Sequence, residues 1–254
     1  MRPRRGLASY LIPLVDVDRM NSCALAVVCT LVAVAPLHAH RPVFVRAEAR
    51  MPSTAVTIPD PDISWAFYAV LPTPGTRQFY RLQGRAGQVI FVQLLVPLRS
   101  GLRAEPPRAA VIGPTGADSI ALWYSASPAS SRAAAGDLST AGVYRAQSRI
   151  DDRVGFYERF SQTRYDQYPP LRVVLPEDGT YWIVVSSTGR AAGAYVLAVG
   201  TEEIFGIHDL PRFPAWWWKA RRHAGLPVWH GVAFIGAVLV VIVAGIVRLW
   251  RAWR

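Results

Sequence analysis

The sequence predicts a mostly β protein: an exported β-sandwich domain followed by a single C-terminal transmembrane helix. Three observations carry this prediction. An apolar run near the N-terminus has the length of a signal peptide, a long middle segment alternates short apolar runs with Pro and Gly, and a second apolar run near the C-terminus carries no formal charge. The 52% hydrophobic residues and the mean hydropathy of +0.20 exclude a wholly soluble protein.

Residues 1–39 are predicted to be a signal peptide. The apolar run from Cys23 is about 14 residues long, shorter than the roughly 20 that a membrane crossing needs, and Ala39 is a small residue suited to cleavage. Met20 is an alternative start of translation that leaves the same mature chain. Cleavage removes both cysteines, which excludes a disulfide framework, a thiolate metal site and a cysteine nucleophile.

Residues 63–205 are predicted to form the sandwich, after an N-terminal extension at residues 40–62. Apolar and aromatic runs between turn sequences predict strands at residues 63–70, 78–83, 89–96, 109–112, 119–124, 171–175, 181–186 and 195–199. The strand at residues 89–96 has an apolar face and a mixed face, so we expect it at the centre of a sheet that packs on a second layer.

Two features complete the predicted domain. Residues 179–183 and 193–197 are similar in sequence, and we expect them to be neighbouring strands of a hairpin joined through residues 187–190. Residues 125–142, rich in Ala, Ser and Gly, are expected to be a flexible insertion.

Residues 228–247 are predicted to be the transmembrane helix, because 20 residues at about 1.5 Å each match the thickness of a bilayer core. Residues 206–227 form an aromatic and basic linker, and residues 248–254 a short basic tail. We expect a short helix at residues 211–225, with aromatic rings toward lipid and basic groups toward phosphate. The predicted membrane-interface residues are Trp216, Trp217, Trp218, Lys219, Arg221, Arg222, Trp250 and Arg251.

The net charge of +11 is concentrated beside this apolar run. Residues 40–210 carry 17 basic and 15 acidic side chains, so the exported domain is nearly neutral. The sequence therefore predicts the lipid bilayer as a partner and argues against nucleic acid. Both flanks of the helix are basic, and the signal peptide decides the orientation: the N-terminal domain is outside and the C-terminus is cytoplasmic, in a single-pass cell-membrane protein.

Residues 155–170 are the candidate recognition segment, expected to be a loop between strands. Five aromatic rings alternate there with charged groups, a composition that suits recognition of a protein or a carbohydrate. The candidate ligand-binding residues are Tyr157, Glu158, Arg164, Tyr165 and Tyr168. In the binding interpretation at least two of the three tyrosines are exposed together. The alternative is a structural loop whose rings fill the core and whose Glu158 pairs with an arginine.

Asp60 and Asp62 are a weak candidate metal site, since two carboxylates at this spacing suit calcium. A turn before the first strand explains the same residues without a metal. We expect no cofactor and no catalytic residue: the sequence contains no Gly-x-Ser-x-Gly, His-Glu-x-x-His or Gly-x-Gly-x-x-Gly, and Lys219 is the single lysine.

The residues from Ser64 to Gly200 resemble the bacterial pre-peptidase C-terminal domain. The similar motifs are the Ala-Gly-Gln turn at residues 86–88, Gly-Thr-Tyr at residues 179–181 and the closing Gly-x-Tyr-x-Leu at residues 193–197. The resemblance implies a jelly-roll-like sandwich that acts in binding or maturation and not in catalysis. This chain departs from the family in having no enzyme domain and in its predicted anchor. The whole arrangement also resembles uncharacterised membrane-anchored bacterial proteins.

The sequence thus favours a membrane-anchored extracytoplasmic module that binds a protein or carbohydrate ligand. Two other functions stay open at this point: a structural subunit of a membrane protein complex, and a cell-surface hydrolase.

Overall fold

The structure, a computed structural model, describes residues 40–46, 49–116, 143–146, 152–187, 190–204 and 206–252. The predicted signal peptide, the alternative start at Met20, the strand expected at residues 119–124 and the insertion at residues 125–142 lie outside the described residues.

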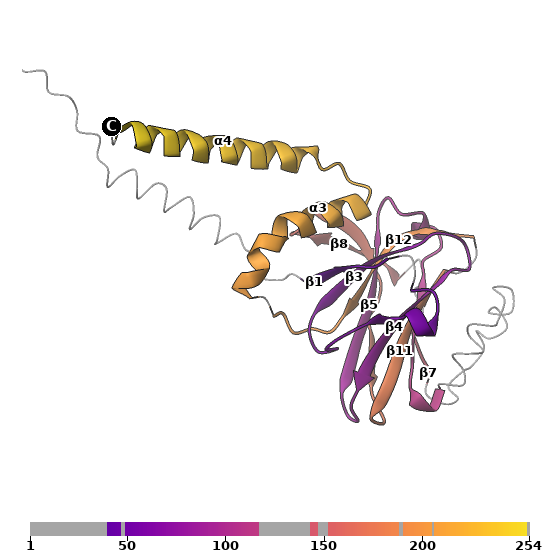
Figure 1. Ribbon diagram of the computed structural model, residues 1–254. Coiled ribbons are helices and arrows are strands. Elements are labelled where there is room, and N and C mark those ends of the chain that lie inside the picture. The colour runs from indigo at the N-terminus through magenta and orange to yellow at the C-terminus, as the bar shows by residue number, and fades with distance from the viewer. Residues whose placement is uncertain are drawn as a thin grey trace, which may run out of the picture. The chain divides into compact units, whose positions relative to one another are not determined.

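The described strands form two mixed sheets that pack as a sandwich (Figure 1). The larger sheet has the order β1, β3, β12, β5, β9, β8, and β10 also pairs with β5. Its strands are β1 (Arg41–Phe44), β3 (Trp65–Leu71), β12 (Gly193–Val199), β5 (Val89–Pro97), β9 (Thr163–Gln167), β8 (Val154–Glu158) and β10 (Leu171–Val174). The smaller sheet has the order β2 (Val56–Thr57), β4 (Arg77–Gly84), β11 (Gly179–Ser186), β6 (Arg108–Ile112) and β7 (Val143–Ala146). Short 3-10 helices are η1 (Pro52–Thr54), η2 (Gly101–Arg103), η3 (Pro114–Gly116) and η6 (Ile207–Arg212).

The main core lies between the sheets and is formed by alternate residues of each strand. In β5 the side chains of Ile90, Val92, Leu94 and Val96 are all buried in it. Strand β5 pairs with β12 on one side and with β9 and β10 on the other, so its predicted central place is confirmed. Alternation indicates this place because a central strand that packs on a second sheet must have an uninterrupted apolar face.

A tyrosine pair satisfies its polar groups inside this core. The hydroxyls of Tyr80 and Tyr195 lie 2.9 Å apart, and the Tyr195 hydroxyl donates to the Gln78 side-chain oxygen over 2.6 Å. Burial raises the pKa of both tyrosines, so both hydroxyls stay protonated and act as hydrogen-bond donors. The two sheets are thereby linked by polar bonds as well as by apolar contact, because Tyr80 belongs to β4 and Tyr195 to β12.

Seven of the eight predicted strands are present within a few residues of their expected bounds, and the eighth lies outside the described residues. The predicted hairpin of β11 and β12 is wrong. Strand β11 pairs with β4 and β6 in the smaller sheet, whereas β12 pairs with β3 and β5 in the larger one. The chain crosses between the sheets here: the Ser187 amide donates to the Thr76 carbonyl, and the Arg190 amide donates to the Glu105 carboxylate.

The segment predicted as an N-terminal extension, residues 40–62, contributes strands to both sheets. Strand β1 runs parallel to β3 and strand β2 parallel to β4. Neither strand was expected, because β2 has two residues and β1 contains Pro42, which cannot donate a backbone hydrogen bond.

The C-terminal segment is tied to β1 through one buried carboxylate. Asp209 in η6 accepts a hydrogen bond from the Gly206 amide at 3.1 Å and from the Arg41 guanidinium at 3.3 Å. Burial would raise the pKa of Asp209, but the Gly206 amide and the positive charge of Arg41 outweigh it and hold the pKa below its ordinary value. The buried carboxylate is therefore charged, and it joins β1 to the segment that follows the last strand.

Two helices follow η6: α3 (Phe213–His223) and α4 (Trp229–Ala252). The predicted short helix is confirmed as α3, which ends where Gly225 adopts a φ of 69° and Leu226 donates its amide to the Arg221 carbonyl. Among the described helices, none combines the length and the apolar character that crossing a membrane requires. The crossing predicted at residues 228–247 is therefore unsupported, although the chain is helical there.

Candidate binding surface on the β8–β9 hairpin

The candidate recognition segment is a β-hairpin. Residues 155–170 were expected to be a loop, but β8 and β9 pair antiparallel, and β9 continues into the larger sheet by pairing with β5. Buried and exposed residues alternate at the start of β9: Thr163 and Tyr165 are buried, and Arg164 between them is exposed. The loop prediction failed because the polar residues Thr163 and Asp166 occupy buried positions, which hides the pattern that identifies a strand.

Glu158 holds the turn of this hairpin. Its carboxylate accepts the amides of Phe160 at 2.6 Å and Ser161 at 2.7 Å, and also the Ser161 hydroxyl. The carboxylate therefore bonds the backbone of its own turn, and this arrangement differs from the pairing with an arginine that was expected in the structural alternative. Ser161 is fully buried, so its hydroxyl serves the turn and is not an accessible nucleophile.

The register of the hairpin gives it two faces. Phe156 lies opposite Tyr165, and Tyr157 lies opposite Arg164. Since successive residues of a strand point to opposite sides of the sheet, the first pair shares one face and the second pair shares the other. The parity of each residue therefore separates the aromatic rings of this segment into two environments.

The face with Phe156 and Tyr165 is buried. It belongs to a second apolar cluster on the outer surface of the larger sheet, to which α3 contributes Ala220. The other buried members of this cluster are Ala66, Tyr68, Leu95, Val196 and Ala198. Burial raises the pKa of Tyr165, and the Tyr165 hydroxyl has no hydrogen-bond partner within bonding geometry among the described residues. Tyr165 is therefore a packing residue.

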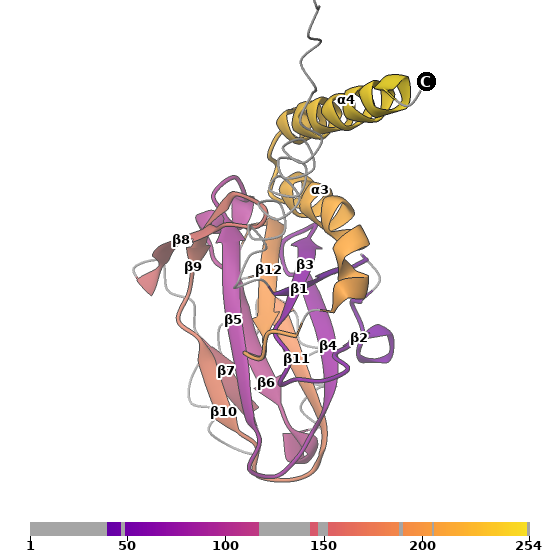
Figure 2. The same cartoon turned by 90° about the vertical axis from the view of Figure 1, so that its left-hand side faces the viewer.

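Helix α3 covers this face and lies beside β3 and β12 in two views (Figures 1 and 2). The His223 ring donates from Nε2 to the Tyr195 carbonyl at 3.0 Å and packs edge-on against Tyr68, with ring centres 5.4 Å apart. Burial lowers the pKa of the His223 imidazole to about 4, so the ring is neutral at physiological pH. Helix α3 is thus part of the folded domain.

Arg221 joins α3 to the hairpin turn. Its Nη1 donates to the Ser161 carbonyl at 3.0 Å, and its Nε and Nη2 donate to the Pro227 carbonyl at 3.2 and 3.1 Å. The guanidinium also lies 5.0 Å from the centre of the Trp217 ring. Arg221 is buried, so its predicted contact with lipid phosphate is wrong: the charge is satisfied by backbone carbonyls that converge on it.

The other predicted interface residues divide by exposure. Lys219 and Arg222 are exposed, and Lys219 lies 5.5 Å from the centre of the Phe44 ring. Trp216, Trp217 and Trp218 are half-buried, and the Trp217 ring packs directly on Gly231 at the start of α4. Trp250 and Arg251, near the end of α4, are exposed.

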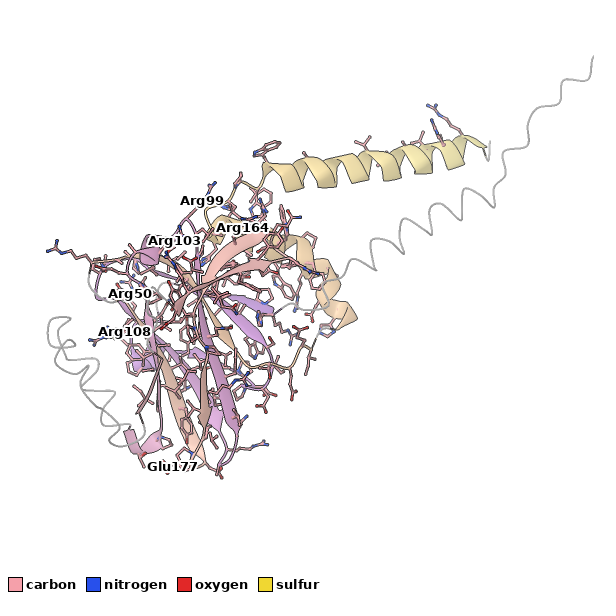
Figure 3. All side chains as sticks on the ribbon, turned by 180° about the vertical axis from the view of Figure 1, so that it is seen from behind. Arg50, Arg99, Arg103, Arg108, Arg164 and Glu177 are labelled. Carbon is pink, nitrogen blue, oxygen red and sulfur yellow. The ribbon has the colours of Figure 1, made fainter. Side chains whose placement is uncertain are left out.

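The opposite face of the hairpin is exposed and basic. Tyr157 is 51% exposed, and Arg164 beside it on β9 is exposed too. Asp166, next but one to Arg164, is buried and accepts from Arg103 Nε at 2.7 Å, with Arg153 Nη1 3.6 Å away. We call Tyr157, Arg164, Arg103 and Arg153 the basic face. Figure 3 shows Arg103 and Arg164 at the same end of the domain.

The basic face carries more positive than negative charge. Two guanidinium groups, those of Arg103 and Arg153, share the single carboxylate of Asp166, and their side chains are 44% and 37% exposed while they contact it. Arg164 adds a third positive charge. Asp166 therefore positions two arginines at the surface without covering them. The face offers one aromatic ring and several fixed bidentate donors to a partner.

The five predicted ligand-binding residues are thus not brought together. Tyr157 and Arg164 share the exposed face, Glu158 bonds its own turn, and Tyr165 and Tyr168 are buried. The expectation that two tyrosines are exposed together is wrong. Tyr168 lies in the main core, and its carbonyl accepts the Gln93 amide group at 2.9 Å.

Sequence reasoning missed Arg103 and Arg153. Arg103 ends η2, 63 residues before Asp166, and no spacing signal connects the two. Arg153 immediately precedes β8, and no motif in the sequence indicates that it contacts Asp166. Only the pairing of β9 with β5 brings these groups to one place.

Asp60 and Asp62 form the expected turn. The Asp60 carboxylate accepts the Asp62 amide at 3.0 Å, and the Asp62 carboxylate accepts from the Gln88 side chain at 2.9 Å. Within the described part of the chain, no three His, Cys, Asp or Glu side chains are grouped to hold a metal ion.

Comparisons with known proteins find similarity at the level of structure. No family model matches the chain, and no curated protein matches it. Solved structures that are similar include PliG of Aeromonas hydrophila, a periplasmic inhibitor of g-type lysozyme, at 15% identity and a TM-score of 0.31, over 64% of this chain and 96% of that one. PliG of Salmonella Typhimurium, also a periplasmic inhibitor of g-type lysozyme, is similar at 14% identity and a TM-score of 0.27, over 65% of this chain and 100% of that one.

The pre-peptidase C-terminal domain of a collagenase from Bacillus anthracis is also similar, at 10% identity and a TM-score of 0.30, over 56% of this chain and 91% of that one. The neighbours therefore include a member of the family that the sequence motifs resemble.

Proposed function

We propose that this chain is an extracytoplasmic binding module whose basic face contacts an acidic surface of a partner protein. The observation that carries the proposal is the exposed Tyr157 opposite Arg164, with Arg103 and Arg153 fixed beside them by Asp166. Tyrosine and arginine are the residues on which protein interfaces most often depend, because both give large contact areas and directed hydrogen bonds.

Two properties of the face favour binding. Tyr157 and Arg164 stand on paired strands and Arg103 is held by a carboxylate, so little conformational entropy is lost when a partner orders them. The surplus positive charge attracts an acidic partner over a distance of about 8 Å in physiological salt and raises the rate of encounter.

A protein is favoured over a carbohydrate as the ligand. A sugar-binding platform of paired tyrosines would need Tyr165 or Tyr168 at the surface beside Tyr157, and both are buried. A single ring surrounded by guanidinium groups suits carboxylates, which arginine binds in bidentate fashion.

Site-specific photo-crosslinking tests the proposal in cells that express the full chain. A photoreactive phenylalanine analogue replaces Tyr157, and the control carries it at Val174, which is 63% exposed on β10. We expect a protease-sensitive adduct from position 157 and none from position 174. An adduct that is degraded by glycosidase and not by protease would contain a carbohydrate and contradicts the proposal. Equal amounts of adduct from positions 157 and 174 contradict it too.

Export and membrane attachment belong to the same proposal and are supported by the sequence alone, through the apolar runs before Ala39 and at residues 228–247. External protease added to intact cells should remove residues 40–210 and leave the C-terminal end with the membrane. Protection of those residues, or recovery of the whole chain in the soluble fraction, contradicts it. Recovery of the chain without companions in mild detergent distinguishes the module from an obligate subunit of a complex.

A further inference from the structure

Among the described strands, β8 forms an edge of the larger sheet. It ends the strand order, and β9 is its neighbour among the described strands (Figure 2). Every second residue of an edge strand directs its backbone N–H and C=O away from the sheet, where another strand can pair with them. Val154 is 64% exposed and Tyr157 51% exposed, so apolar surface accompanies these free backbone groups.

Two of the other edges, β1 and β2, carry features that oppose pairing. Strand β1, at the far edge of the same sheet, contains Pro42, which has no N–H to offer, and β2 in the smaller sheet has only two residues. Strand β8 has five residues, Val-Gly-Phe-Tyr-Glu, with neither proline nor lysine among them. A Cβ on Gly155 would meet no atom within 4 Å, so the strip beside Tyr157 is open.

We propose that an extended acidic segment of the partner protein pairs with β8 and continues the larger sheet. This inference rests on the proposed function and states how the partner is recognised. Arg153 immediately precedes β8 and Arg159 immediately follows it, and both are exposed. Arg153 contacts Asp166 and therefore lies on the basic face with Tyr157, and Arg159 begins the turn at the other end of the strand.

The spacing of these residues defines the segment that fits. Arg153 and Arg159 are six positions apart, so the matching strand has acidic residues at its first and seventh positions. Its third and fifth positions then lie beside Tyr157 and Gly155, where apolar side chains pack on the exposed ring. The pattern is the same for parallel and antiparallel pairing, since it is symmetric.

A second copy of this chain does not fit the edge. Two β8 strands related by a twofold axis pair antiparallel about one residue. Pairing about Phe156 is the register in which the two strands overlap over their full length, and it brings Arg153 opposite Arg159. Registers shifted by one residue pair only three residues of each strand, and the one about Gly155 also brings Asp152 opposite Glu158. Like charges that face each other across strands are destabilising, so the occupant is a different protein of acidic character.

A synthetic heptapeptide tests the inference against the full chain in detergent. The probe is fluorescently labelled Glu-Thr-Val-Thr-Val-Thr-Glu, and its binding is measured by fluorescence anisotropy. We expect saturable binding with a Kd below about 1 mM, weakened at least about tenfold when both Glu are replaced by Lys. Absence of saturable binding overturns the inference.

Two N-methylated peptides distinguish strand pairing from charge attraction alone. One carries N-methyl groups on both Val and the other on the second and sixth residues, so each blocks one of the two alternating sets of amides. Pairing predicts that one peptide loses binding at least about tenfold and the other keeps it, because a strand bonds its neighbour through alternate residues. If both bind as well as the parent, strand pairing is wrong while the proposed acidic recognition by the basic face stands.

A pair of variants locates the bound peptide. Val154→Glu adds a negative charge to β8, and Val174→Glu makes the same change at an equally exposed position on β10. We expect Val154→Glu to weaken binding at least about tenfold and Val174→Glu to change it less than about twofold. Equal losses for the two variants place the peptide elsewhere and overturn the inference.

Discussion

The two faces of the β8–β9 hairpin are built from the same residues in alternation, and their environments are opposite. Phe156 and Tyr165 pack under α3, whereas Tyr157 and Arg164, each one position away, are exposed on the basic face. The comparison shows that the aromatic composition of residues 155–170 does not define a function by itself. Parity within the strands decides which rings stabilise the fold and which can meet a partner.

The largest expected effect separates the two tyrosines. Tyr165→Ala removes a fully buried ring and should lower the free energy of unfolding by about 3–5 kcal/mol. Tyr157→Ala removes a half-exposed ring and should change it by less than about 1 kcal/mol. Thermal and urea unfolding of both variants measure the difference. Similar losses for the two variants would show that the hairpin has one environment and not two.

Acid should destabilise the domain through His223, which packs on the buried face. The folded state keeps His223 neutral down to a pKa of about 4, whereas an unfolded histidine protonates near 6.5, so the unfolded state binds more protons between these values. The free energy of unfolding therefore falls as the pH falls from 6.5 to 4, by at most about 3 kcal/mol from this group.

Urea unfolding across that pH range checks the acid effect, with His223→Gln as the control. The variant keeps a donor for the Tyr195 carbonyl and has no proton to gain. Its free energy of unfolding should depend less on pH than that of the parent. Above pH 7, where histidine is neutral in both the folded and the unfolded state, the two proteins should show the same pH dependence. An identical pH dependence in both proteins would contradict the role of His223 in the acid effect.

Two neighbouring arginines of α3 sharpen the comparison further. Arg221→Ala leaves the carbonyls of Ser161 and Pro227 without their donor and should cost about 1–3 kcal/mol of stability. Arg222→Ala, the matched change at an exposed position, should cost less than about 0.5 kcal/mol. Chemical unfolding of the two variants compares them, and a larger loss from Arg222→Ala would contradict the packing of α3 on the hairpin.

Much of the sandwich follows from the sequence because its strands are apolar runs bounded by turn residues. Strand β5 has an apolar residue at every second position from Ile90 to Val96, and both its existence and its central place could be predicted from that pattern. The Asp60 turn and α3 were also predictable, since each depends on neighbouring residues. These elements are determined locally, and local patterns identify them.

The failures concern contacts between distant parts of the chain. Strands β11 and β12 are close in sequence and alike in composition, which favours a hairpin, but each finds its partners in a different sheet. The basic face was missed in part for the same reason: Arg103 reaches Asp166 across 63 positions. No spacing in the sequence predicts the contact between Arg103 and Asp166, because the contact depends on the pairing of β5 with β9.

The claim that the basic face is the recognition surface is tested most directly by two charge reversals of equal size. Arg164→Glu changes the basic face, and Arg172→Glu makes the same change in net charge on β10, where Arg172 lies over the Phe91 ring. The readout is the adduct formed in cells by the photoreactive residue at position 157. We predict that Arg164→Glu abolishes the adduct and that Arg172→Glu leaves it within about twofold of the parent. Loss of the adduct in both variants, or in neither, would contradict the assignment of recognition to this face.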